Sequence, residues 1–100
     1  METKVIVIDD QPLEGDMIGF VLERDCPQVR YIGQALSARR GVELVEETLP
    51  DVVFLDIEMP GMDGISAIRL LREKQPTLHI IILTAFDDFK YVQRAMREGA

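Results

Sequence analysis

Short runs of apolar residues alternate along the chain with segments in which apolar residues recur every three or four positions. The runs are rich in β-branched side chains and predict four strands, over 4–8, 29–34, 52–55 and 79–83. The segments between and after them have helical periodicity, over 12–24, 37–48, 65–75 and 87–98. The predicted order of elements is therefore βαβαβαβα.

Proline and serine residues set the expected helix boundaries. Pro12 suits the first turn of a helix, and Pro27 ends that helix because a residue before proline is pushed out of the α region. In this first helix four apolar residues fall at helical spacing: Leu13, Met17, Phe20 and Val21. Ser37 is expected to cap the second helix. Three residues are expected on the buried side of the second helix: Val42, Val45 and Leu49.

Apart from Lys4 and His79 at their first positions, the first, third and fourth strands are apolar throughout rather than at alternate positions. A parallel sheet covered on both faces requires this pattern. Strands that alternate with helices are joined by right-handed crossovers. The expected fold is α/β, with a doubly wound parallel sheet.

Composition narrows the class of protein. One hundred residues suit a single domain, and the net charge of -7 argues against a surface that binds nucleic acid. No apolar run approaches the roughly 20 residues that a membrane helix needs, and no secretory signal opens the chain. Cys26 is the single cysteine, so no internal disulfide forms. We expect a cytoplasmic protein that does not contact membranes.

Four polar residues follow the predicted strands at one end. Asp9 and Asp10 follow the first strand, Asp56 follows the third and Thr84 follows the fourth. Ligands of an open parallel sheet bind at the carboxyl ends of its strands, so these side chains are expected to converge. Clustered carboxylates must hold protons or a cation, and oxygen ligands without histidine or thiolate favour Mg²⁺. A carboxylate beside such a cation can attack a phosphoryl donor.

Each of these residues also has a simpler interpretation. Asp10 alone is better explained as a helix N-cap, and Asp56 alone equally well as the acid of a strand-to-turn exit. Thr84 with Asp87 resembles a capping box. Three independent caps have no reason to fall at the ends of neighbouring strands, which favours a shared site.

The segment that starts at Asp56 begins like a calcium loop of the EF-hand type. Gly61 fits the sixth position of such a loop. The twelfth position requires Glu but holds Ala67, and Pro60 stands where a ligand belongs. The calcium-loop hypothesis is therefore rejected.

The chain resembles the receiver domain of bacterial two-component response regulators over its whole length. The resemblance is strongest in three segments, 5–10, 50–64 and 81–85. It implies a flavodoxin-like fold in which Asp56 accepts a phosphoryl group from a sensor histidine kinase. It makes Thr84 the switch hydroxyl and gives Ala85 a backbone amide that contacts the phosphoryl group.

The same resemblance implies a Mg²⁺ site. Asp10 is the expected direct ligand, Asp9 acts mainly through water, Asp56 contributes its carboxylate and Glu58 its backbone carbonyl. The domain is then a phosphorylated signalling switch rather than a turnover enzyme. It would regulate an output domain, commonly a DNA-binding one, that these residues do not encode.

Receiver domains have five strand–helix units, and four are found in residues 1–100, which implies the strand order 2-1-3-4 and a domain incomplete at its C-terminus. The phosphate-binding lysine of the family has no counterpart here. We therefore expect an exposed fourth strand that supports a homodimer or an exchange of elements between copies. Two other functions stay open. One is a phosphorylation-independent binding or dimerisation module, and the other, more remote, is a metal-dependent phosphatase with an aspartyl-phosphate intermediate.

Overall fold

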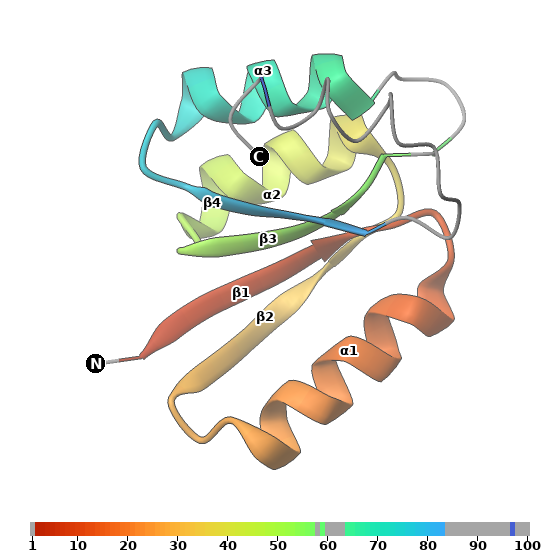
Figure 1. Ribbon diagram of the computed structural model, residues 1–100, viewed down its shortest axis with the longest axis vertical. Coiled ribbons are helices and arrows are strands. Elements are labelled where there is room, and N and C mark those ends of the chain that lie inside the picture. The colour runs from red at the N-terminus through yellow and green to blue at the C-terminus, as the bar shows by residue number, and fades with distance from the viewer. Residues whose placement is uncertain (1, 58, 60–63, 84–96, 98–100) are drawn as a thin grey trace.

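A four-stranded parallel sheet of order β2-β1-β3-β4 is the centre of the computed structural model, which describes residues 2–57, 59, 64–83 and 97 (Figure 1). The strands are β1 (Thr3–Ile8), β2 (Val29–Ala35), β3 (Val52–Asp56) and β4 (His79–Leu83). The helices are α1 (Pro12–Asp25), α2 (Ala38–Thr48) and α3 (Gly64–Lys74). The α/β fold and the strand order are confirmed. The helix predicted over 87–98 lies outside the described residues, apart from Arg97.

The helices form a layer on each face of the sheet, with α1 on one side and α2 and α3 on the other (Figure 1). The main core lies between the sheet and the α2–α3 layer. Its largest fully buried side chains come from β1, β3, α2, α3 and the residue just before β4: Ile6, Ile8, Val53, Leu55, Val45, Ile68, Leu71 and Leu78. Complete burial of each such side chain stabilises the fold by about 1.5–3 kcal/mol. This core holds β1 and β3 rigidly side by side.

Helix α1 packs on β2 through glycines rather than through its apolar stripe. A Cβ at Gly19 would lie 2.5 Å from the ring of Tyr31, and one at Gly15 would overlap the side chain of Gln34. The helix therefore approaches the sheet more closely than a larger residue allows. The four apolar residues at helical spacing point outward, with Leu13 69% and Phe20 64% exposed.

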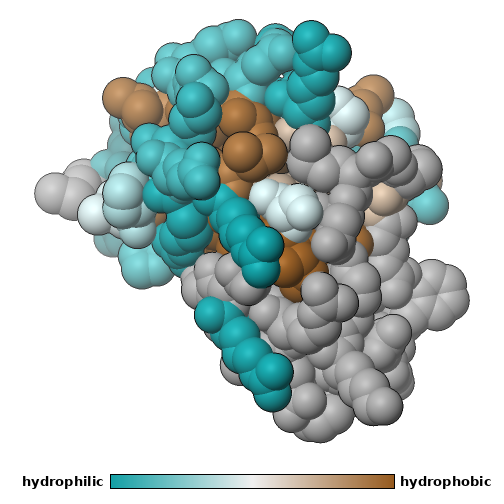
Figure 2. All heavy atoms as spheres, turned by 90° about the horizontal axis from the view of Figure 1, so that it is seen from above, coloured by the Kyte–Doolittle hydropathy of each residue, from teal (hydrophilic) through white to brown (hydrophobic). Residues whose placement is uncertain are grey.

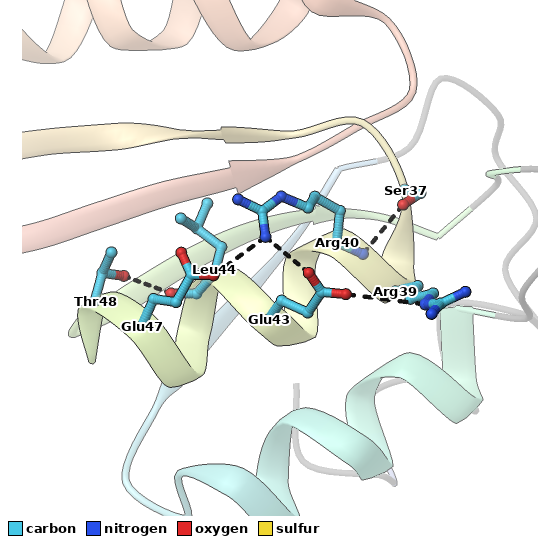
Figure 3. A network of polar contacts seen from close by, with 7 residues as sticks. All are labelled: Ser37, Arg39, Arg40, Glu43, Leu44, Glu47 and Thr48. Atoms are coloured by element: carbon cyan, nitrogen blue, oxygen red, sulfur yellow. Dashed lines mark hydrogen bonds and ion pairs between the residues drawn. The ribbon is translucent and has the colours of Figure 1, made fainter.

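A polar network covers the outer side of α2 (Figure 3). The hydroxyl of Ser37 accepts a hydrogen bond from the backbone N–H of Arg40 at 3.1 Å, which confirms the predicted N-cap. The guanidinium of Arg40 donates to Glu43 at 2.8 Å and to Glu47 at 3.2 Å. Ion pairs as exposed as these contribute little to stability, so they support the helix without determining its position.

The C-terminus of α2 corrects one prediction. Val45 is fully buried and Val42 packs against the core, as expected, but Leu49 is 60% exposed. Leu49 is the C-cap and has a left-handed backbone, with φ 48° and ψ 59°. This conformation takes the residue off the helical face on which the spacing placed it.

The amino ends of three strands meet at Asp51. Its carboxylate accepts the backbone N–H of Lys4 at 2.8 Å, and its own N–H donates to the carbonyl of Lys4 at 2.8 Å. Its carbonyl accepts the N–H of His79 at 3.0 Å. The ammonium group of Lys4 donates to the carbonyl of Thr48 at the end of α2. Lys4 therefore belongs to the amino end of the sheet.

The side of the molecule that carries α3 has a mainly hydrophilic described surface, with apolar side chains showing between the polar ones (Figure 2). In α3 three apolar residues are buried against the core, Ile65, Ile68 and Leu71, as their spacing predicts. Among the described helices, none is long and apolar enough to span a membrane.

Candidate functional site

The carboxyl ends of β1 and β3 bring two aspartates together. Ile8 of β1 is in register with Leu55 of β3, so the residues that follow them are Asp9 and Asp56. The carboxyl ends of β1 and β3 lie at the same edge of the sheet (Figure 1). The parallel register therefore places both carboxylates at the edge where ligands of such sheets bind.

Asp9 is fully buried, with 0% of its surface exposed. Its backbone N–H donates to the carbonyl of Ala35 at 3.0 Å, which extends the pairing of β1 with β2 by one residue. Its Oδ1 accepts the backbone N–H of Gln11 at 2.9 Å. Its Oδ2 is buried and has no hydrogen-bond partner among the described residues. A buried carboxylate oxygen without a partner is costly, and a cation would satisfy it.

A third carboxylate joins these two from α1. Oxygen atoms of Asp9, Glu14 and Asp56 all lie within 4.8 Å of one another. Glu14 is exposed, Asp56 is half-buried and Asp9 is buried, so the group runs from the surface into the sheet edge. Two carboxylates at this separation repel by about 3.5 kcal/mol at an effective dielectric constant of about 20. The group must therefore take up protons or a cation.

The pKa of Asp9 reflects its burial and the neighbouring negative charge. Burial, together with the neighbouring Glu14 carboxyl, raises the pKa of the Asp9 carboxyl from 3.8 to about 6. The N–H of Gln11 acts in the opposite direction because it stabilises the charged form. Without a cation, Asp9 is therefore partly protonated just below neutral pH.

The donor set fits Mg²⁺. It consists of carboxylate oxygens, which hard cations prefer, and it contains a buried oxygen that lacks a partner. Positive charge placed among the three carboxylates would remove their repulsion and lower the pKa of Asp9. Asp56, half-buried at the end of β3, stays accessible to an incoming group.

Of the other residues predicted for the site, the structure describes Asp10. Asp10 is half-buried and follows Asp9 directly, but its carboxylate is not part of the group of three. Its simpler interpretation as an N-cap is wrong, because Gln11 is the N-cap of α1 and makes no side-chain capping bond. Three predicted residues lie outside the described residues: Glu58, Thr84 and Ala85.

Glu14 belongs to the acidic group but not to the site predicted from the sequence. The predicted site residues directly follow strands or lie in the loops after them, whereas Glu14 lies in the first turn of the following helix. In a parallel α/β fold the helix after a strand begins at the same edge at which the strand ends. An acidic residue in the first turn of α1 was therefore the available signal.

Comparison with known protein families and proteins gives a consistent result. The model of the response regulator receiver domain family matches residues 5–100. The chain is 33% identical over 99 residues to the uncharacterized transcriptional regulatory protein YhcZ of Bacillus subtilis, covering 97% of this chain and 45% of that protein. It is 39% identical over 97 residues to protein-glutamate methylesterase/protein-glutamine glutaminase 3 of Geobacter sulfurreducens, covering 97% and 26%.

Solved structures show the same likeness. The response regulator domain of Thermotoga maritima CheB superimposes with a TM-score of 0.90 at 28% identity, covering all of this chain and 75% of that chain. The signal receiver domain of the putative response regulator NarL from Mycobacterium tuberculosis gives a TM-score of 0.89 at 31% identity, covering 99% and 79%. The chain thus spans less than half of the two curated relatives named above and about three quarters of these receiver structures.

Proposed function

The chain belongs to the response regulator receiver domain family, and from that membership we propose that it is a phosphorylation-dependent signalling switch whose Asp56 accepts a phosphoryl group from a sensor histidine kinase. One observation carries this proposal. The half-buried carboxylate of Asp56 lies within 4.8 Å of the fully buried carboxylate of Asp9. The pair combines an accessible nucleophile with a buried acid suited to a cation.

The proposed reaction is a phosphoryl transfer. An oxygen of the Asp56 carboxylate attacks the phosphorus of a phosphohistidine, a P–O bond forms and the P–N bond breaks. The released imidazole takes a proton from solvent, and Asp56 becomes an acyl phosphate. Bound Mg²⁺ supplies positive charge for the phosphoryl oxygens.

In this proposal, other residues of the chain bind the cation and contact the phosphoryl group. Asp9, fixed by the N–H of Gln11, and Asp56 would hold the cation at the sheet edge. Asp10 and the backbone carbonyl of Glu58 complete its ligands in this proposal. Thr84 and Ala85 contact the phosphoryl group and couple its arrival to a change in the following segment.

The whole protein is proposed to act through a further domain. The relatives named above are a transcriptional regulatory protein and a methylesterase/glutaminase, and this chain covers 45% and 26% of them. Other relatives include the transcriptional regulatory protein MctR of Rhizobium johnstonii. We therefore assign residues 1–100 to a cytoplasmic receiver domain and propose a transcriptional output domain in the same protein.

Intact-mass measurement after incubation with Mg²⁺ and acetyl phosphate tests this function. We expect a phosphoryl adduct on the wild-type chain that disappears in Asp56→Asn and in the presence of EDTA. Asp51→Asn is the matched control, because it changes the aspartate at the opposite end of β3 and keeps an oxygen to accept the Lys4 N–H. Asp51→Asn should retain the adduct. An adduct that persists in Asp56→Asn would contradict the assignment of the phosphoacceptor.

Self-association is the second candidate function, and the exposed apolar surface favours it. In α1 the exposed stripe consists of four apolar residues: Leu13, Met17, Phe20 and Val21. On the sheet, Ile81 of β4 is 45% exposed, and no described strand pairs with the outer edge of β4. Sedimentation over a range of protein concentrations should show a dimer that Phe20→Ser weakens. A monomer at every concentration, together with a normal Asp56 adduct, would leave the switch as the single function.

A further inference from the structure

Glu14 lies on the first turn of α1, beside the two aspartates at the strand ends. The chain leaves β1 at Ile8, passes through the buried Asp9 and enters the helix at Pro12, so this turn lies beside the carboxyl end of the sheet. The carboxylate of Glu14 is within 4.8 Å of those of both Asp9 and Asp56. The residue itself is exposed and has solvent available on its outer side.

A role in the helix alone does not account for this position. An acidic residue in a first turn interacts favourably with the helix dipole, and Glu14 has that benefit wherever its carboxylate lies near the turn. Placing the carboxylate beside two other acids adds repulsion that solvent exposure would avoid. The inward position is favourable when a cation lies between the three groups, or when Asp9 and Glu14 share a proton; Mg²⁺ titration distinguishes the two.

The buried oxygen of Asp9 is an independent observation that a ligand belongs there. Asp9 is fully buried, and its Oδ2 has no hydrogen-bond partner among the described residues. Its other oxygen is occupied by the N–H of Gln11. Glu14 therefore adds its carboxylate to a site that already has a buried, unsatisfied acceptor.

We propose that Glu14 is an additional carboxylate ligand of the divalent cation at this site, beside the acids at the strand ends. The inference rests on the proposed function for the existence of the cation site. It adds to that function a ligand from a helix, which increases the number of charged ligands around the cation. The number of charged ligands tunes the affinity of oxygen-ligand sites, so this chain should bind Mg²⁺ more tightly than it would without Glu14.

Calorimetric titration of the 100-residue chain with Mg²⁺ tests the proposal without a phosphodonor. Glu14→Gln should weaken Mg²⁺ binding by about tenfold, the lower end of the range seen for loss of groups that tune a metal site. Glu23→Gln is the matched control, because it removes the same charge from an exposed position near the other end of α1. Its affinity should stay within about twofold of the wild-type value, because exposed charges at that distance are largely screened by salt.

A second variant separates metal binding from support of the helix. Glu14→Asp keeps an acid near the helix N-terminus but shortens the side chain, so it should also weaken Mg²⁺ binding while preserving the stability measured in EDTA. Equal Mg²⁺ affinity in the wild type, Glu14→Gln and Glu14→Asp would overturn the inference.

Asp9→Asn distinguishes this failure from a failure of the proposed function. If Asp9→Asn abolishes binding and Glu14→Gln does not weaken it, the cation site stands and the role of Glu14 is refuted. If the wild-type chain does not bind Mg²⁺, the cation site of the proposed function and the role of Glu14 are both refuted.

Discussion

Replacing Asp9 by Asn is expected to stabilise the chain in the absence of metal. The pKa of Asp9 rises from 3.8 to about 6 on folding, chiefly through burial. The folded chain therefore binds this proton more tightly than the unfolded chain does. Through this group alone, the free energy of unfolding falls as the pH rises from about 4 to about 7.

The size of the effect follows from the shift. A difference of about two pKa units corresponds to about 3 kcal/mol of lost stability at pH 7 and about half as much at pH 5. Asn carries no charge, so Asp9→Asn removes this loss. Its side-chain oxygen can still accept the N–H of Gln11, and its amide can donate to the carboxylate of Glu14 or Asp56.

Urea denaturation in EDTA at pH 5 and pH 7 measures the difference. We expect Asp9→Asn to be more stable than the wild type at both pH values, with the larger gain at pH 7. Millimolar Mg²⁺ should stabilise the wild type and leave the variant unchanged, because ligand binding to the folded state alone raises the free energy of unfolding. A variant less stable than the wild type in EDTA at pH 7 would refute the reasoning.

Two further substitutions test the packing of the helices, both by urea denaturation at neutral pH. Leu49→Gly should raise the free energy of unfolding by about 1 kcal/mol, because a left-handed backbone penalises residues with a Cβ and the exposed side chain buries little. A variant less stable than the wild type would instead show that the Leu49 side chain packs in the folded state. Gly19→Ala should cost about 1–3 kcal/mol despite the better helix propensity of alanine, because its Cβ would meet the ring of Tyr31. Gly33→Ala is its control and should be nearly neutral, since nothing lies within 4 Å of the added atom.

Elements with a strong internal pattern were predictable from the sequence. The strands and α3 follow from apolar runs and spacing, because burial of these side chains dominates the stability of those segments. Ser37 was predictable as a cap because its hydroxyl satisfies a backbone group of its own helix. In each case the deciding interaction is local or depends on burial alone.

The exposed face of α1 and the place of Glu14 were not predictable in this way. The helical spacing of Leu13 and Phe20 does not show which face of the helix meets the sheet, and here the small volume of Gly15 and Gly19 decides it. Glu14 enters the site through the direction in which α1 leaves the loop. Both features depend on how two elements approach each other, which the pattern within one element does not contain.

The hydrogen bonds of Asp51 fix the positions of three strands relative to one another at one edge of the sheet. Asp51 directly precedes β3 and is hydrogen-bonded to Lys4 of β1 and His79 of β4, so it joins the amino ends of three strands at the edge opposite the acids. Because β1 and β3 are also paired in register as far as Ile8 and Leu55, the two strands reach the opposite edge without slipping against each other. The spacing of the Asp9 and Asp56 backbones is therefore set by the whole length of the sheet rather than by the loops that follow it.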